Sequence, residues 1–232
     1  MSDISREIRI VFFGDSICVG QGISVHAGWV TRIAKRMEAL SQKLGKELLV
    51  VNASVNGNTT RQALERMAYD VQSHGVDIML VQFGMNDCNF WQTDKGNPRV
   101  SEKAFSANLE EMFARGRSFG AQKILLNTNH RSTRTTETMP HTNVTYEQSN
   151  QRYNQIIRDL ADQHDDVMLT DMEKIFADHI NANPQDAQSL VLDDGLHLSL
   201  KGHDLYFDAI YPKLEKELTT LFSGKNYESS AA

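Results

Sequence analysis

Short apolar segments alternate along the chain with longer segments of helical periodicity, and this alternation restricts the fold more than any other feature. The apolar segments have strand length and cover residues 8–13, 48–52, 76–83, 123–127 and 167–170. Helices are expected over residues 28–44, 59–73, 101–119, 145–164 and 200–222. Gly45, Gly75 and Gly120 each lie between an expected helix and the next strand, where helices often end in a left-handed residue. We therefore predict a five-stranded parallel sheet with helices on both faces, a three-layer α/β/α fold. For the strand order we take 2-1-3-4-5, one of the common orders of doubly wound sheets.

The size and charge of the chain restrict its class. With 232 residues, of which 40% are hydrophobic and 23% charged, the composition is that of a globular domain. We expect one domain over residues 1–222 and a disordered tail over 223–232. The net charge of -6 disfavours nucleic acid as a partner, because a nucleic-acid surface needs clustered Lys and Arg. No integral membrane segment and no signal peptide is expected, so we predict a cytoplasmic protein.

The chain contains two cysteines, Cys18 and Cys88. Two are too few for a disulfide framework, and their spacing is not that of a zinc site. Each follows the end of an expected strand, so the two can approach one another, but free thiols are the expectation. We expect no metal and no cofactor.

Two motifs near opposite ends of the chain carry the residue types of nucleophilic catalysis. Ser16 belongs to a Gly-Asp-Ser triplet that directly follows the first apolar segment, whereas Asp194 and His197 belong to an Asp-Gly-Leu-His motif. A serine hydroxyl becomes a good nucleophile when an imidazole takes its proton and a carboxylate orients that imidazole. Asp193 competes with Asp194 for the orienting role, since both lie near His197.

Polar residues also follow the second and third expected strands. In a sheet of order 2-1-3-4-5 these two loops are neighbours of the loop that holds Ser16. Acyl transfer needs hydrogen-bond donors at the oxygen that becomes negative in the tetrahedral intermediate. The N–H of Ser16, the N–H of Gly57 and the side-chain amide of Asn86 are the candidate donors of this oxyanion hole.

These separated blocks together resemble the SGNH (GDSL) hydrolase superfamily, which is named after a Ser, a Gly, an Asn and a His. The matching residues, between Phe12 and His203, are Ser16, Gly57, Asn86, and the pair Asp194 and His197. The three-residue offset from Asp194 to His197 matches the family block and favours Asp194 over Asp193. The resemblance implies a flavodoxin-like fold and ester hydrolysis through an acyl-serine. Ile17 replaces the leucine of the family motif, and the start of the loop after the fourth strand, residues 127–131, lacks the prolines often found there.

Further residues near these blocks are candidates for supporting or substrate-binding roles. Asp15 and Asp87 stand beside the candidate serine and asparagine, and we expect Asp87 to bond backbone N–H groups of neighbouring loops. The two segments 88–100 and 128–143 are long for this architecture, and long loops at this edge of a sheet tend to form ligand sites. The candidate pocket residues in them are Phe90, Trp91, His130 and Arg131.

The sequence thus predicts a carboxylic ester hydrolase that acts on a small-molecule ester. The polar composition of residues 128–143 favours a hydrophilic substrate such as an acetylated carbohydrate or a small thioester. Lysophospholipids and short aryl esters remain alternatives. An acyltransferase that uses the same Ser, His and Asp is a second alternative, and a non-catalytic flavodoxin-like binding module is a third.

Overall fold

The computed structural model describes residues 7–222, which form a sheet of five parallel strands. The strands are β1 (Ile8–Gly14), β2 (Leu48–Asn52), β3 (Ile78–Gln82), β4 (Lys123–Asn127) and β5 (Val167–Thr170). Their order is β2-β1-β3-β4-β5, and each pair of neighbours is parallel. The predicted fold and strand order are confirmed. The expected disordered tail, 223–232, lies outside the described residues.

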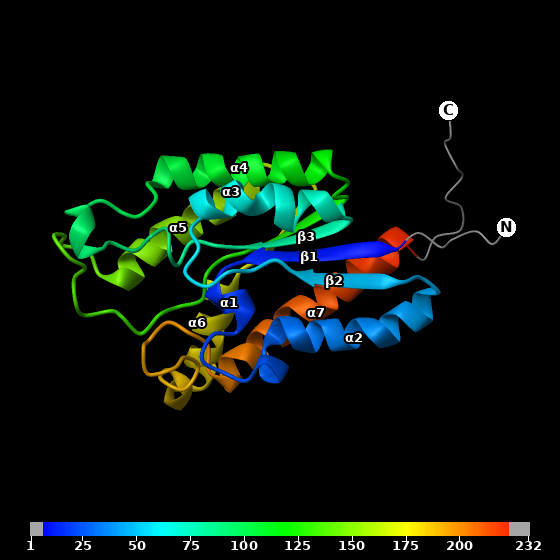
Figure 1. Cartoon of the computed structure of the whole chain (residues 1–232). Helices are drawn as coiled ribbons and strands as arrows, with labels where there is room; N and C mark the ends of the chain where they lie inside the picture. The colour runs from blue at the N-terminus through cyan, green and yellow to red at the C-terminus, as the bar shows by residue number, and fades with distance from the viewer. Residues whose placement is uncertain (1–6, 223–232) are drawn as a thin grey trace.

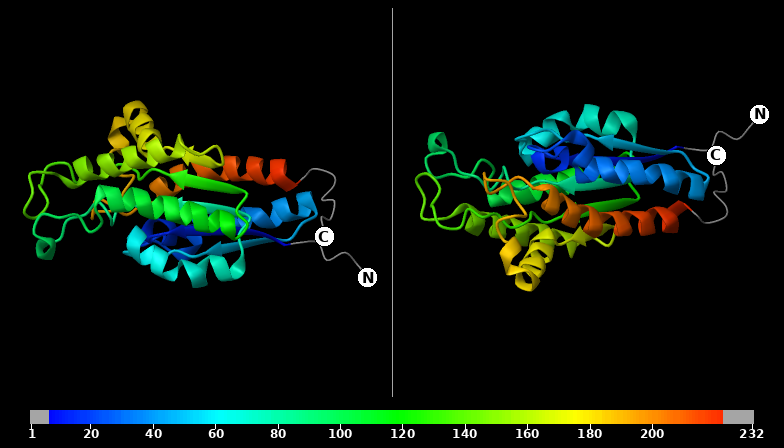
Figure 2. Two further views of the ribbon diagram at one scale, coloured as in Figure 1. Left: turned by 90° about the horizontal axis from the view of Figure 1, so that it is seen from above. Right: turned by 90° about the horizontal axis from the view of Figure 1, so that it is seen from below.

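Helices cover both faces of this sheet (Figure 1). The α-helices are α1 (Ser16–Val19), α2 (Trp29–Leu44), α3 (Thr60–Asp70), α4 (Glu102–Ser118), α5 (Tyr146–Ala161), α6 (Met172–Ala182) and α7 (Leu200–Phe222). Short 3-10 turns are η1 (Val25–Ala27), η2 (Gln72–His74), η3 (Gln92–Asp94) and η4 (Pro184–Asp186). Figure 2 shows α3, α4 and α5 on one face and α2 and α7 on the other. No helix within residues 7–222 combines the length and apolar composition needed to cross a bilayer.

The central strands are apolar because helices bury both of their faces. Every residue of β3 is buried, and so are the last five residues of β1. Phe12 on β1 packs edge-on against Trp29, and Trp29 packs against Tyr206 of α7. Burial of aromatic side chains of this size contributes about 2–3 kcal/mol each. This packing fixes β1 and the turn that follows it.

The strand register brings three loops together at the carboxyl edge of the sheet. Gly14 at the end of β1 is paired with Gln82 at the end of β3, while Phe12 is paired with Asn52 at the end of β2. The β2 loop continues along β1, because the N–H of Val55 donates to the carbonyl of Gly14 at 3.1 Å. The loops that begin after Gly14, Asn52 and Gln82 are therefore neighbours, as the strand order predicted.

Some element boundaries differ from those expected. The helix α6 was not predicted, although Asp171 caps its first turn by accepting from the N–H of Lys174 at 3.1 Å. Strand β3 is shorter than the apolar segment 76–83. The expectation for Gly45 is confirmed: it ends α2 with a left-handed φ of 62°.

Candidate active site

A tight turn between β1 and α1 places Ser16 at the carboxyl edge of the sheet. Asp15 caps the short helix, because its Oδ1 accepts a hydrogen bond from the N–H of Ile17 at 3.0 Å. A Cβ atom on Gly14 would lie 2.5 Å from the Sγ of Cys18, so the turn leaves no room for a larger residue at position 14. Ser16 itself is 7% exposed.

Ser16 forms a continuous hydrogen-bonded chain with His197 and Asp194. The Nε2 of His197 lies 3.0 Å from the Oγ of Ser16, and its Nδ1 lies 2.5 Å from the Oδ2 of Asp194. In this geometry the carboxylate holds the Nδ1–H tautomer, and Nε2 is left to accept the serine proton. The structure therefore brings together the three residues that the sequence singled out.

The loop that holds Asp194 and His197 is fixed by its own backbone. The Oδ1 of Asp194 accepts from the N–H groups of Leu196, at 2.8 Å, and His197, at 2.9 Å. Partial burial acts to raise the pKa of Asp194, but the hydrogen bonds from His197 and Leu196 outweigh it and hold the pKa below its usual value. Asp194 is therefore ionised at neutral pH. The structure assigns the carboxylate beside His197 to Asp194, whereas Asp193 is an exposed neighbour.

Gly57 and Asn86, the other candidate oxyanion donors, lie on the two loops beside Ser16. Gly57 has a φ of 74°, a left-handed backbone conformation that favours glycine. A Cβ built on it would meet no atom within 4 Å, so the space beside this residue is open. The Nδ2 of Asn86 donates to the Oδ2 of Asp15 at 3.2 Å. Because an amide nitrogen carries two hydrogens, the second remains available to a substrate oxygen.

Two buried carboxyl groups support these loops. Asp15 is fully buried, and burial raises its pKa to about 7. Asp87 is also fully buried, and burial raises its pKa to about 6. The Oδ1 of Asp87 accepts from the N–H of Thr60 at 2.9 Å and from its hydroxyl at 2.5 Å, which ties the β3 loop to the start of α3. This contact to a neighbouring loop is of the kind expected for Asp87.

His130 was expected to face substrate, and the structure contradicts this placement. Its side chain is fully buried between Phe176 and Tyr206. Its Nε2 lies 2.7 Å from the carbonyl oxygen of Leu196, and its Nδ1 lies 2.9 Å from the hydroxyl of Tyr206. Burial lowers the pKa of His130 to about 4, so the ring is neutral, donates from Nε2 to Leu196 and accepts from Tyr206. It fixes the backbone next to His197 instead.

The other three candidate pocket residues have different surroundings. The side chain of Arg131 is 39% exposed, its Nε lies 3.7 Å from the Oε1 of Glu147, and it lines a small cavity beside α6. Phe90 is half-buried and packs on the core, whereas Trp91 is 50% exposed. The guanidinium of Arg99 lies 4.1 Å from the centre of the Trp91 ring. Of these three residues, only Trp91 has an exposed aromatic ring. Arg99, which lies over this ring, also hydrogen-bonds to Gly57 and Asn86.

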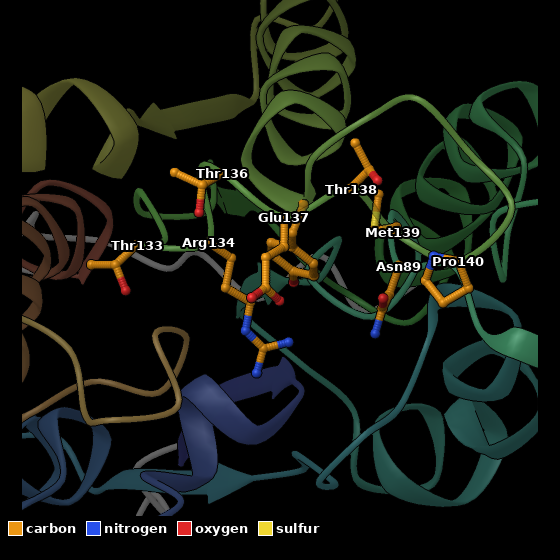
Figure 3. Close-up of a pocket in the computed structure, with 9 residues that line it drawn as sticks. Asn89, Thr133, Arg134, Thr136, Glu137, Thr138, Met139 and Pro140 are labelled. Carbon is orange, nitrogen blue, oxygen red and sulfur yellow. The ribbon is translucent and has the colours of Figure 1, made fainter.

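A pocket of about 390 Å³ is formed mainly by the loop that follows β4, with Asn89 and Tyr146 completing its wall (Figure 3). On one side the N–H of Thr133 donates to the carbonyl of Gly195 at 3.0 Å. On the other side the N–H of Asn89 donates to the carbonyl of Asn86 at 3.4 Å. Both long loops contribute to the wall, which consists of Asn89, Thr133, Arg134, Thr136, Glu137, Thr138, Met139, Pro140 and Tyr146. All of these side chains except Met139 and Pro140 carry groups that can donate or accept hydrogen bonds.

Arg134 connects this pocket to the candidate catalytic loop. From the sequence it counted only as one of the polar residues of segment 128–143, not as a candidate site residue. Its Nε donates to the carbonyl oxygen of Asp194 at 2.8 Å, while its guanidinium lies over the ring of Tyr146. Figure 3 shows Arg134 beside Glu137 in the middle of the pocket. In the sequence, the signal that could have identified Arg134 was its position as a charged residue in a long loop at the ligand-binding edge of the sheet. No spacing rule links such a residue to Asp194.

The structure also bears on cysteine and metal chemistry. Cys18 and Cys88 are buried free thiols, as expected, and burial raises the pKa of both. Within residues 7–222, no group of three or more His, Cys, Asp or Glu side chains is arranged to hold a metal ion.

Comparison with known proteins identifies the chain as a carboxylic ester hydrolase. The profile of the GDSL-like lipase/acylhydrolase family matches residues 12–205, and the chain belongs to this family. The match includes Ser16, Gly57, Asn86, Asp194 and His197.

Individual proteins and structures resemble the chain over half of its length or more. It is 21% identical to an arylesterase of Vibrio mimicus over 210 residues, 90% of each chain. It is 27% identical to the esterase TesA of Pseudomonas aeruginosa over about half of each chain. Axe2, an acetylxylan esterase from Geobacillus stearothermophilus, superposes with a TM-score of 0.71 at 20% identity, covering 91% of this chain and 95% of that chain. The acetyl xylan esterase AlAXEase gives 0.72 at 21% identity, with 89% and 100% covered.

Proposed function

We propose that the protein is a serine esterase that cleaves small carboxylic esters through an acyl-serine intermediate. Ser16 is the nucleophile, His197 is the general base, and Asp194 orients the imidazole. The N–H groups of Ser16 and Gly57 and the amide of Asn86 bind the oxyanion. The observation that carries this proposal is the unbroken contact from Ser16 Oγ through His197 to Asp194, at 3.0 and 2.5 Å.

The reaction proceeds in two similar halves. His197 Nε2 takes the hydroxyl proton as Ser16 Oγ bonds to the ester carbonyl carbon, and the carbonyl oxygen becomes the oxyanion. The C–O bond to the alcohol then breaks, and the alcohol leaves with the proton that His197 returns. Water repeats the sequence on the acyl-serine, which releases the carboxylic acid and restores Ser16.

The pocket between the two long loops favours a hydroxyl-rich alcohol as the leaving group. Its volume of about 390 Å³ is at the small end of the usual range for ligand pockets. Hydroxyl, amide, carboxylate and guanidinium groups from Thr133, Asn89, Glu137 and Arg134 line it. Such a wall can replace the hydrogen bonds that a polyol makes with water, which a long acyl chain cannot use. An acetylated carbohydrate fits this description, and acetyl xylan esterases share the fold.

A substrate panel tests reaction and substrate class together. Purified protein is assayed against p-nitrophenyl esters of increasing acyl length and against acetylated sugars, with the Ser16→Ala variant in parallel. We expect turnover of short acyl esters, higher kcat/KM on acetylated sugars, and loss of turnover in Ser16→Ala. Unchanged turnover in Ser16→Ala contradicts the serine mechanism, while a preference for long acyl chains contradicts the proposed substrate.

A substitution in the pocket wall tests whether this pocket binds the sugar part of the substrate. Glu137 lines the pocket and is exposed, so we expect Glu137→Ala to raise KM for an acetylated sugar while leaving KM for p-nitrophenyl acetate nearly unchanged. Equal effects on both substrates contradict sugar binding at this wall.

Product analysis with an added alcohol distinguishes hydrolysis from acyl transfer: a hydrolase forms mainly free acid.

A further inference from the structure

Arg99 lies at the end of the 88–100 loop, close to both candidate oxyanion loops. The ends of this loop are held together, because the N–H of Arg99 donates to the carbonyl of Asn89 at 2.9 Å and the N–H of Val100 donates to the carbonyl of Asp87 at 3.2 Å. The Tyr153 hydroxyl also donates to the carbonyl of Val100. The backbone of Arg99 is therefore fixed relative to the loop that carries Asn86.

The guanidinium of Arg99 joins the two loops through a single nitrogen. Its Nη1 donates to the carbonyl oxygen of Gly57 at 3.2 Å and to the Oδ1 of Asn86 at 3.3 Å. An Nη atom of arginine carries two hydrogens, so it can serve both acceptors at once. The second nitrogen, Nη2, reaches the Oε1 of Gln62 at 3.5 Å.

These contacts determine which way the Asn86 amide faces. A carboxylate oxygen of Asp15 accepts from its Nδ2 at 3.2 Å, while Arg99 donates to its Oδ1. An amide rotated by 180° would lose its donation to Asp15 and would place its NH₂ against the guanidinium, where two donors repel each other. Donation from a cation to the amide oxygen also polarises the amide and makes its N–H a stronger donor.

We propose that Arg99 is a positioning residue that holds the Asn86 amide and the Gly57 loop in the arrangement of an oxyanion hole. The inference rests on the proposed function, in which these two groups bind the negative oxygen. Arg99 acts through them and contacts no reacting atom. Since the negative charge develops in the transition states and the tetrahedral intermediate but not in the bound substrate, loss of this positioning lowers kcat more than it raises KM.

A purely structural role is the alternative, because Arg99 also stacks on Trp91. Arg99→Met keeps an apolar stem over the ring but removes every donor, whereas Arg99→Lys keeps a cation that donates. We expect Arg99→Met to lower kcat on p-nitrophenyl acetate about tenfold or more, with a KM change below about twofold. We expect Arg99→Lys to recover part of that loss. Full kcat in Arg99→Met, or a loss confined to KM, overturns the proposal.

A double-mutant cycle with Asn86→Ala separates positioning from general loss of stability. If Arg99 acts through the Asn86 amide, Arg99→Met costs less in the Asn86→Ala background than in the wild type. Multiplicative effects of the two substitutions contradict the proposal. Arg117 provides the matched control, since it stacks on Phe113 and pairs with Asp166 away from the site. Arg117→Met is expected to lower thermal stability without lowering kcat.

The assay separates this proposal from the proposed function. An inactive wild-type protein contradicts the esterase assignment itself. An active wild type whose kcat is insensitive to Arg99→Met contradicts the role of Arg99 alone.

Discussion

The Nε2 of His197 lies 3.0 Å from the Oγ of Ser16, although 181 positions separate the two residues in the chain. Ser16 is held at the end of β1 by a turn that Asp15 caps. His197 is held in the loop before α7, where His130 bonds the preceding carbonyl. Two independently fixed segments therefore meet at hydrogen-bonding distance, which is the preorganisation that nucleophilic catalysis needs.

The neighbouring carboxylates Asp193 and Asp194 provide a matched pair of variants. Only Asp194 hydrogen-bonds to His197, so we expect Asp194→Ala to lower kcat by about 10²- to 10⁴-fold. Asp193→Ala should leave kcat within about twofold of the wild type, because surface substitutions away from a site have small effects. Steady-state kinetics on p-nitrophenyl acetate measures both. A larger loss in Asp193→Ala contradicts the assignment.

Gly57 and Gly45 test the oxyanion role in the same way. Both have left-handed φ values, 74° and 62°, and a Cβ on either would meet no atom within 4 Å. Alanine at either position should cost about 1–2 kcal/mol of unfolding free energy. Only Gly57→Ala should also lower kcat, on the order of tenfold, because it disturbs an oxyanion donor. Equal kcat values for the two variants would argue against Gly57 as a donor.

His130 and Arg131 are adjacent in sequence, but substitution of His130 should destabilise the fold much more than substitution of Arg131. His130→Ala leaves a cavity and two unpaired buried groups, so we expect a loss of about 2–4 kcal/mol in unfolding free energy. Arg131→Ala removes an exposed side chain whose ion pair is long, so its loss should stay below about 1 kcal/mol. Urea denaturation measures both. The opposite ranking would contradict the buried placement of His130.

Asp15 makes the stability of the fold depend on pH. Its pKa rises to about 7 in the folded state, mainly through burial, so the folded protein binds a proton that the unfolded chain releases above about pH 4. The stability from this proton is fully present below about pH 4 and is lost as pH rises through about 7. Asn does not titrate, so the Asp15→Asn variant does not lose this stability as pH rises. The unfolding free energy of the variant, relative to that of the wild type, should therefore increase by up to about 1.4 kcal/mol per pH unit across that window. A difference independent of pH between about 4 and 8 would contradict the shift.

The fold was predictable because buried parallel strands leave long apolar segments in the sequence. All five strands were expected at or near their observed positions, and the order β2-β1-β3-β4-β5 brought the blocks of Ser16, Gly57 and Asn86 to one edge. Helix α6 was missed although its apolar residues Met172, Ile175, Phe176 and Ile180 recur at helical spacing, so the signal was present in the sequence.

The side chains of the long loops were not predictable from sequence. Adjacent residues such as His130 and Arg131 point into the core and into solvent, and an irregular loop has no period that would distinguish them. The contacts of Arg99 with Gly57 and Asn86 join segments that meet only in the folded chain. Arg134 reaches the carbonyl of Asp194 for the same reason.

Covalent labelling of the candidate nucleophile Ser16 tests the central claim most directly. A fluorophosphonate reacts with a serine that an imidazole activates, and mass spectrometry of the intact protein and its peptides locates the adduct. We predict one adduct per chain, on Ser16, with loss of labelling in Ser16→Ala and much slower labelling in His197→Ala. Ester hydrolysis by a protein that shows no adduct on Ser16, or labelling that persists in Ser16→Ala, would contradict the account.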